Sequence, residues 1–153
     1  MIRAARKEDF PAVKELMNGL HGAHAEARPD VYKKDLVFQM ENYEQMLGDS
    51  AARIFVYEAE RVFGLMMLKI KETQESEAQV GRRFCHIEAI VVDPGLRKAG
   101  VGRKLLEYAN EMSRELGLDA IELMVWDFNE DARRFYEKDG MTTKYTVLEK
   151  KLR

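Results

Sequence analysis

The stretch DPGLRKAGVGRKLL, residues 93–106, decides the fold. It opens with a DPG sequence that stops a strand and closes with apolar side chains at helical spacing, so a strand, a turn and a long helix follow one another. The first turn of a helix leaves amide hydrogens free, and the helix dipole adds partial positive charge, so this geometry binds anions. Gly100 and Gly102 leave the backbone open to a phosphate group, while Arg97 and Arg103 add charge. The segment therefore predicts a phosphate-binding turn.

Two common phosphate-binding patterns do not fit this turn. Gly95 and Gly100 have the spacing of a nucleoside-triphosphate loop, but Val101 and Gly102 stand where that loop needs Lys and Ser or Thr. A dinucleotide-binding turn needs a glycine at the position of Leu105. The sequence therefore disfavours nucleoside triphosphates and dinucleotides as ligands. Taken alone, the glycines also fit a tight turn with close helix packing.

Further strands and helices are predicted on both sides of this turn. Before it, residues 84–92 are predicted to form a strand. Residues 53–59 and 61–70 each show a sequence period of two, which predicts an antiparallel hairpin. After it, a helix runs from the turn to Gly117, residues 120–126 form another strand, and a shorter helix begins at Asn129 as its cap. The last segment, residues 142–152, is predicted to be a strand.

The N-terminal part is expected to contain a short strand and two helices. Ile2 opens the strand, and Asp9 is placed to cap the first helix with its carboxylate. The segment at residues 21–30 contains Gly22 and Pro29 and is expected to break the helical period. A second helix follows at residues 37–47. Strands and helices thus alternate through one α/β sheet.

Composition limits the kind of protein. The chain has 153 residues, 46% hydrophobic and 34% charged, so we expect one globular domain over residues 1–153. A net charge of -2 gives no positive field for nucleic acid. The only cysteine cannot form a disulfide within the chain, and the longest apolar run, residues 62–68, is too short to span a membrane. We expect a cytoplasmic protein with neither nucleic-acid nor membrane partners.

Several motifs in order along the chain resemble those of the GNAT superfamily of N-acetyltransferases. Arg97-x-x-Gly100-x-Gly102 is similar to that family's acetyl-CoA pyrophosphate loop, and IEAIVVDP before it resembles the family's central strand. NEDARRFYEKDGM, Asn129 to Met141, resembles the following helix and turn, and LEKKL resembles the last strand. Two positions depart from the usual pattern, because Met141 replaces a phenylalanine and Lys98 replaces a frequent glycine.

The resemblance implies a fold and a co-substrate. The fold is a single-domain α/β GNAT-type fold, with a mixed, largely antiparallel sheet splayed near residues 90–92 and flanked by about four helices. The co-substrate is acetyl-CoA, whose pantetheine arm pairs with the main chain of Ile90, Val91 and Val92 and contacts Asn129, although that residue also fits a simple helix cap. The backbone amides that hold the pyrophosphate belong to Arg97, Lys98, Ala99, Gly100, Val101, Gly102 and Arg103.

Two side chains are expected to carry the chemistry. Alternation along a strand places Glu88 on the face of His86, Ile90 and Val92, where it either faces solvent or accepts a proton from an amine, directly or through water. By resemblance, Tyr136 protonates the departing CoA thiolate, although an aromatic packing role also fits it. The acetyl group then passes directly to the amine, and an amide near Ile90 or Val91 stabilises the oxyanion. No metal is required.

Other reactive side chains receive weaker assignments. Cys85 falls on the strand face opposite Glu88 and is predicted to be a small buried hydrophobe, not a nucleophile. His21 and His24 lack a companion at a secure metal-ligand spacing. The resemblance places their segment beside the acceptor pocket, so substrate contacts are expected from His21, His24, Arg28 and Tyr32.

The sequence leaves the acceptor and the biological role open. Small amines, polyamines, aminoglycosides, amino acids and peptide termini all present a suitable amine. A homodimer is possible. Two alternatives to an enzyme are a noncatalytic acyl-CoA-binding or sensing module and a protein-interaction domain with a vestigial CoA site. Retention of Glu88 and Tyr136 argues against the first alternative.

Overall fold

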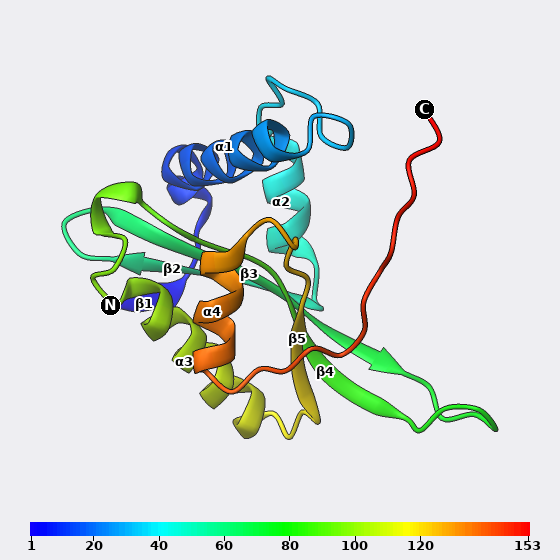
Figure 1. Cartoon of the computed structure of the whole chain (residues 1–153). Coiled ribbons are helices and arrows are strands. Elements are labelled where there is room, and N and C mark those ends of the chain that lie inside the picture. The colour runs from blue at the N-terminus through cyan, green and yellow to red at the C-terminus, as the bar shows by residue number, and fades with distance from the viewer.

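Five strands form one sheet in the order in which they occur along the chain, and the computed structural model describes all 153 residues (Figure 1). The first four strands pair antiparallel, and β5 pairs parallel to β4. This confirms the predicted mixed, largely antiparallel α/β sheet. The strands are β1 (Ile2–Ala4), β2 (Ala52–Glu58), β3 (Val62–Thr73), β4 (Arg82–Val92) and β5 (Ala120–Leu123).

Helices cover both faces of the sheet, which gives the molecule two apolar cores. One core lies between the sheet and the first two helices, and its fully buried members include Val13, Tyr43 and Leu65. The other lies under the last two helices and includes Leu105 and Cys85. The helices are α1 (Phe10–Ala27), α2 (Met40–Gly48), α3 (Val101–Glu115) and α4 (Glu130–Lys138), with short 3-10 turns η1 (Lys7–Asp9) and η2 (Pro94–Leu96).

Both helices predicted after the phosphate-binding turn are confirmed. α3 packs Leu105, Leu106 and Ala109 against the sheet, which is the stripe of an amphipathic helix. Gly117 follows its last turn with a φ of 66°, a left-handed conformation that a glycine adopts without strain. α4 begins where Asn129 caps it, because the Asn129 Oδ1 atom accepts the Ala132 amide at 3.2 Å.

The expected break after the first helix is wrong, because α1 continues to Ala27. Glycine in a helix costs about 1 kcal/mol relative to alanine. Gly22 has open space around it, and the continued helix buries Ala25 at 2% exposure, so packing outweighs propensity. Pro29 then stops the helix, since the residue before a proline avoids the helical conformation.

Asp9 stands at the start of α1, but its carboxylate does not cap the helix. It instead accepts two hydrogen bonds from the Arg3 guanidinium, both at 2.8 Å, and one from the Arg6 amide at 2.7 Å. Arg3 also donates to Glu58 of β2 at 2.7 Å. These contacts tie the beginning of α1 to the edge of the sheet. The cap prediction failed because a nearby guanidinium is a stronger partner than free helix amides.

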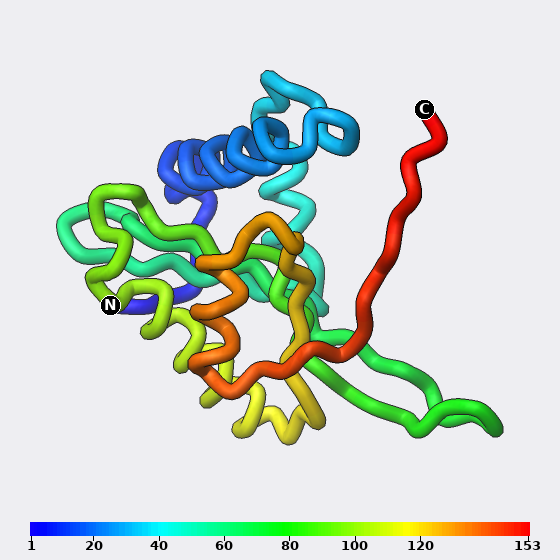
Figure 2. Tube along the Cα trace, in the orientation of Figure 1, coloured from blue at the N-terminus to red at the C-terminus, as the bar shows by residue number.

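Two other predicted elements are shorter in the structure, and a third is absent. The second helix begins at Met40 and not at residue 37, and β5 ends at Leu123 and not at Trp126. The last predicted strand is absent, because residues 142–153 contain no helix or strand. This segment, here called the C-terminal arm, runs out from the end of α4 in an extended course (Figure 2). Its side chains reach the segment after α1, where Glu149 pairs with Arg28 at 2.8 Å and Lys151 lies 3.5 Å from Asp30.

Candidate acetyl-CoA site and the gap between two strands

A gap opens between β4 and β5 on the side where the predicted site residues lie. The two strands pair only from Phe84–Ala120 to Ile87–Leu123, whereas β4 continues to Val92. The last five residues of β4 therefore have no partner on the β5 side, although residues 89–92 still pair with β3. This confirms the splay predicted near residues 90–92.

A β-bulge at Glu88 lies where this gap begins. Along the β3–β4 ladder, Met67 pairs with Ala89 and Leu68 pairs with Ile87, which leaves Glu88 without a partner. An extra residue in one strand twists that strand and redirects its side chains. The bulge thus places a carboxylate at the point where β4 separates from β5.

The bulge also overturns one expectation about the faces of β4. Cys85 and Ile87 pack in the core under α3, and Ile90 and Val92 pack against the same core. Residues on either side of the bulge thus share a face although odd and even positions normally alternate. Glu88 lies on the other side, beside Lys69, so the prediction that it shares a face with Ile90 and Val92 is wrong.

The Glu88 side chain is partly exposed and lies near one cation. About a third of it, 34%, is accessible to solvent, and its Oε1 atom is 3.9 Å from the Lys69 Nζ atom. Lys69 also approaches Asp49 at 3.7 Å, so it is shared between two carboxylates. Glu88 therefore combines access to solvent with a place inside a strand, which suits a group that exchanges protons with a bound molecule.

Backbone amides of β4 face the gap. The Asp93 amide donates to the Phe63 carbonyl of β3 at 2.7 Å. In an antiparallel ladder alternate residues point their amides to the same side, so the Val91 amide also faces β3. The amides of Ile90 and Val92 consequently face the gap, where a ligand in an extended conformation could pair with them as an added strand.

The turn between β4 and α3 presents free amide hydrogens, as its sequence predicts. The Ala99 amide is an exception, because it donates to the Leu96 carbonyl at 3.2 Å. Gly100 adopts a φ of 84° and Lys98 a φ of 67°, which is the left-handed region. The amides that donate to no group within the chain belong to Arg97, Lys98, Gly100, Val101, Gly102 and Arg103.

The two glycines of this turn have different surroundings. A Cβ atom at Gly100 would meet no atom within 4 Å, so this glycine supplies backbone conformation. A Cβ atom at Gly102 would lie 3.5 Å from Phe135 and 3.7 Å from Val92, which is ordinary van der Waals contact. Close packing of α3 therefore does not by itself require a glycine at position 102.

Charged side chains stabilise the turn from its outer side. The Asp93 carboxylate accepts the Gly95 amide at 2.8 Å and pairs with Arg61 at 3.0 Å, and these contacts hold its pKa below the usual range. Arg97 donates to the Val92 carbonyl at 3.4 Å. Arg103 is 78% exposed and pairs with Glu107 one helical turn away at 2.9 Å. Both arginines thus remain at the surface of the turn.

Tyr136 lies on α4 and packs against the core under α3. Its ring contacts that of Phe135 edge to face, with centroids 5.2 Å apart. Burial raises the pKa of the Tyr136 phenol. The phenol thus keeps its proton more firmly than a tyrosine in water, which is the state that a proton donor requires. Asn129 at the start of α4 uses its side chain as the helix cap, as the simpler of its two predicted roles requires.

Beyond the end of β5, five rings meet in an aromatic cluster that consists of His21, His24, Tyr32, Trp126 and Phe128. The Trp126 indole donates to the Tyr32 hydroxyl at 3.0 Å, and His24 stacks on Tyr32 with centroids 5.3 Å apart. The sequence predicted a break in the helix at the two histidines, but both lie in α1. The four residues predicted to border the acceptor pocket are thus brought together.

Arg28 and the two histidines of this region have partners within the chain. Arg28 lies over the Trp126 ring at 4.8 Å and pairs with Asp30 at 2.7 Å and Glu149 at 2.8 Å. The His21 Nε2 atom lies 2.6 Å from the Lys33 carbonyl. Burial lowers the pKa of His24, and the nearby His21 lowers it further. The sequence analysis did not identify Trp126 and Phe128 as candidate site residues, although a lone tryptophan just after a strand could have indicated them.

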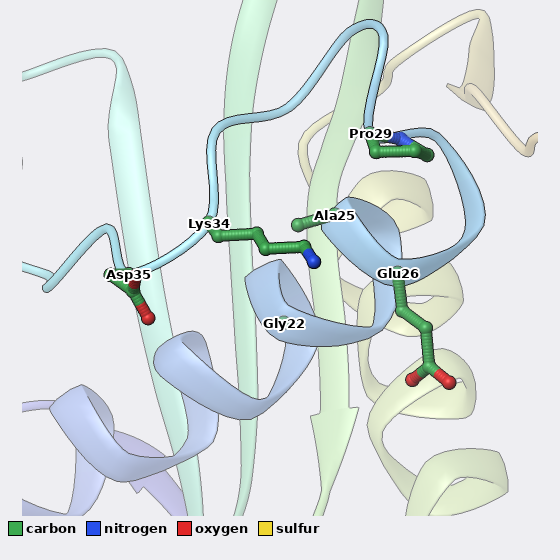
Figure 3. Close-up of a pocket in the computed structure, with 6 residues that line it drawn as sticks. All are labelled: Gly22, Ala25, Glu26, Pro29, Lys34 and Asp35. Carbon is green, nitrogen blue, oxygen red and sulfur yellow. The ribbon is translucent and has the colours of Figure 1, made fainter.

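Other candidate sites are weaker. Cys85 is buried, and burial raises the pKa of its thiol, as expected of a small core residue. No three His, Cys, Asp or Glu side chains are grouped closely enough to hold a metal ion. A pocket of about 290 Å³ lies beside the end of α1, where Lys34 reaches across toward Ala25 while Glu26 points away (Figure 3). This pocket is lined by neither strand of the gap.

Comparison with known proteins now identifies the family. A model of the acetyltransferase (GNAT) family matches residues 13–141, which include the turn, the bulge and α4. The chain belongs to this family. No helix of this GNAT protein has both the length and the apolar character needed to cross a membrane.

Curated relatives of this GNAT protein match it over about half of its length. An uncharacterized N-acetyltransferase in the pepI 3' region of Lactobacillus delbrueckii subsp. lactis is 33% identical over 81 residues, covering 53% of this chain and 46% of that protein. Glucosamine 6-phosphate N-acetyltransferase of Trypanosoma brucei brucei is 39% identical over 80 residues, covering 52% and 50%. The chain thus spans about half the length of these relatives.

A solved structure resembles this GNAT protein over nearly its whole length. The crystal structure of a mutant of the BH1408 protein from Bacillus halodurans superposes with a TM-score of 0.96 at 25% identity, covering 99% of both chains. The likeness therefore extends over nearly the whole length of both chains.

Proposed function

We propose that this GNAT protein transfers the acetyl group of acetyl-CoA to a primary amine. The observation that carries the proposal is the position of the gap. The β4 edge that lacks a β5 partner leads directly into a turn whose amides are free, so one extended ligand with a phosphate end can bind both.

The turn is suited to the pyrophosphate of CoA. Six amides donate to no group within the chain, and those at the start of α3 are reinforced by the helix dipole. Arg97 and Arg103 add positive charge at the surface. We assign the pyrophosphate to the amides of residues 97–103, with Ala99 left out because its amide already has an acceptor.

The β4 edge is suited to the pantetheine arm and to the reacting carbonyl. The amides of Ile90 and Val92 face the gap, and Val91 between them faces β3. Of the two amides considered for the oxyanion, Ile90 is therefore the one that can reach a ligand in the gap. A fixed amide of this kind stabilises the charge that develops on a thioester oxygen under attack.

Glu88 and Tyr136 supply the proton transfers. A primary amine has a pKa near 10.4 and arrives protonated at neutral pH, so attack on a thioester requires a base. Glu88 takes this proton, directly or through water, and the amine nitrogen then bonds to the acetyl carbon. The C–S bond breaks, and Tyr136 donates its proton to the sulfur. The amine nitrogen then loses its second proton, which restores the Tyr136 phenol, and Glu88 releases the first proton to water. The protein releases an amide and a free thiol.

The acceptor is assigned here only by its reacting group. The relative named for glucosamine 6-phosphate is named for an amine, which supports a nitrogen acceptor. Glu88 opens to solvent beside Lys69, and the aromatic cluster lies beyond β5, so the acceptor is expected to enter between these regions.

Thiol release tests the proposal against its two alternatives. Acetyl-CoA is mixed with the protein and a panel of amines, and the free thiol is measured together with the mass of the acetylated product. An enzyme releases thiol in proportion to product for at least one amine. A binding module shows acetyl-CoA affinity by calorimetry without turnover, and an interaction domain shows neither, so either result would contradict the proposal.

A further inference from the structure

One primary amine of the chain lies beside the carboxylate that we assign as the base. The Lys69 Nζ atom is 3.9 Å from the Glu88 Oε1 atom, and Lys69 is the only basic side chain within 4 Å of Glu88. Lys69 belongs to β3, which runs beside β4 on the side away from β5 (Figure 1). Neighbouring strands are about 4.8 Å apart, and the four-carbon stem of a lysine can span that distance. The Lys69 amine therefore reaches over β4 toward the border of the gap.

The bulge on β4 brings this amine and the carboxylate together. On the β3–β4 ladder Lys69 is opposite His86, while Glu88 is opposite no residue of β3. Residues that lie opposite each other share a face of the sheet, and the Glu88 side chain lies on this face beside Lys69. Glu88 also stands where β4 loses its β5 partner. The same carboxylate thus borders both the Lys69 amine and the gap in which we propose that the thioester binds.

The ammonium group of Lys69 is held loosely between two carboxylates. Its Nζ atom is 3.7 Å from Asp49 and 3.9 Å from Glu88, and both distances are too long for a hydrogen bond. Lys144, by contrast, donates to Glu122 at 2.7 Å. About a third of the Lys69 side chain, 35%, is exposed, so the amine can move while water solvates the two carboxylates. A lysine held in this way is free to approach a reacting carbon.

We propose that Lys69 is a self-acetylation site, to which the protein transfers the acetyl group of bound acetyl-CoA when no other acceptor is present. This inference rests on the proposed function, because the reaction uses the same gap, base and proton donor. Glu88 takes a proton from the Lys69 ammonium, and the nitrogen bonds to the acetyl carbon. The C–S bond breaks as Tyr136 donates its proton to the sulfur, and the nitrogen loses its second proton, which restores the phenol. The products are free CoA, an acetylated Lys69 and one proton that Glu88 releases to water.

Lys71 is the matched comparison on the same strand. It lies two residues further along β3, so its side chain is on the same face, opposite Phe84. Lys71 is also more exposed than Lys69. Chemical acetylation by acetyl-CoA in solution follows exposure, so it would modify Lys71 at least as readily as Lys69. Transfer by the protein depends instead on the distance from Glu88, and it favours Lys69.

Mass spectrometry of the full-length protein tests the proposal. The parent is incubated with acetyl-CoA and no added amine, and acetylation is followed at each lysine. Lys69 should be modified at least about 10-fold faster than Lys71, because the bound thioester is held near it. The rate per molecule should not change with protein concentration, since the transfer takes place within one chain.

Two substitutions by arginine follow the same reaction through the thiol. In the parent, a burst of a single thiol per chain should accompany acetylation. Lys69→Arg keeps a positive charge between the two carboxylates but cannot be acetylated, because a guanidinium stays protonated, so it should abolish the burst. Lys71→Arg should leave the burst unchanged. A burst that persists in Lys69→Arg, or a loss of the burst in Lys71→Arg, would overturn the proposal.

Glu88→Gln separates catalysis from proximity. Glutamine keeps the size of the side chain but cannot take the proton, so acetylation of Lys69 should slow by about 10²-fold or more at neutral pH. If Glu88 served only as an ion-pair partner, the substitution would release the amine and the modification would become faster. Such an acceleration would overturn the proposal. Equal acetylation of Lys69 and Lys71 in the parent, or a rate that rises with protein concentration, would do the same.

The amine panel of the thiol-release assay, run on the same preparation, separates this proposal from the proposed function. Turnover of an added amine with Lys69 left unmodified would overturn self-acetylation alone. Absence of both turnover and Lys69 acetylation would overturn the proposed function together with it. Acetylation of Lys69 that depends on Glu88 would support both.

Discussion

The turn after β4 and the aromatic cluster after β5 lie beyond the ends of two neighbouring strands, but they are built in different ways. The turn consists of consecutive residues, 93–103, and offers mainly backbone amides. The aromatic cluster combines side chains from α1, the following connection and the segment after β5. A backbone site tolerates many sequences and recognises one group, phosphate, whereas a side-chain site changes with every substitution. We therefore expect the turn to bind the shared co-substrate and the cluster to select the acceptor.

The largest expected effect is at the boundary between these regions, on Glu88. Glu88→Gln removes the base but keeps the size of the side chain, so kcat/KM for the amine should fall about 10² to 10³-fold at neutral pH. The loss should shrink at high pH, where the amine arrives without its proton. Glu72→Gln on the neighbouring strand β3 is the matched control and should change little.

A loss that is equal at every pH would remove Glu88 from the proton path. It would assign the carboxylate to substrate binding or to the structure of the bulge.

Tyr136→Phe tests the side of the molecule that is expected to bind acetyl-CoA. Phenylalanine keeps the ring and removes only the hydroxyl, so kcat should fall by about 10²-fold while KM for acetyl-CoA changes little. Tyr108→Phe is the control, since Tyr108 packs against the same core from α3. Steady-state kinetics in which Tyr136→Phe stays within about twofold of the parent would contradict the proton-donor role.

Asp9→Asn tests whether the contacts of Asp9 stabilise α1, the helix that carries the two histidines of the aromatic cluster. The Arg3 hydrogen bonds lower the pKa of Asp9, whose side chain is 9% exposed, so its folded-state contribution exists above the unfolded pKa near 3.8. The substitution should lower the free energy of unfolding by about 2 kcal/mol at pH 7.

Urea unfolding at two pH values checks the sign of this effect. As the pH falls through the folded-state pKa, Asp9 of the parent itself becomes protonated, and the difference between the two proteins should narrow. A difference that stays constant down to strongly acidic pH would show that the charge of Asp9 does not stabilise the start of α1.

The smallest expected effect belongs to Trp126→Phe in the aromatic cluster. The change removes the indole donor to Tyr32 and reduces the surface under Arg28. We expect KM for the acceptor to rise about fivefold, the loss of roughly one hydrogen bond, while acetyl-CoA affinity stays unchanged. An equal loss of acetyl-CoA affinity in calorimetry would erase the distinction between the two regions.

Much of the fold was predictable because it depends on local patterns. The DPG stop, the glycine turn and the stripe on α3 each use neighbouring residues, and all three appear where the sequence places them. The bulge at Glu88 was not predictable, since it arises from the register between β3 and β4. The same limit explains the missing C-terminal strand, because apolar alternation predicts a strand but does not say which edge it joins.

The candidate site also has one part that the sequence predicts and another that only the structure shows. The free amides of residues 97–103 follow from the turn sequence, with Ala99 as the exception that only the structure reveals. Trp126 and Phe128 contact residues more than 90 positions earlier in the chain: Phe128 meets His24 of α1, and Trp126 donates to Tyr32 over a separation of 94. No local pattern carries that information.

The most direct test of the central claim is an amide NMR titration with CoA. If the pyrophosphate binds the turn, the amide resonances of Gly100, Val101, Gly102 and Arg103 should shift most, because their hydrogens gain an acceptor. The Ala99 amide already donates to Leu96, so it should shift least among the residues of the turn. The contradicting result is a titration in which these four amides stay in place while resonances around Gly22 and Ala25, at the pocket beside α1, move with CoA.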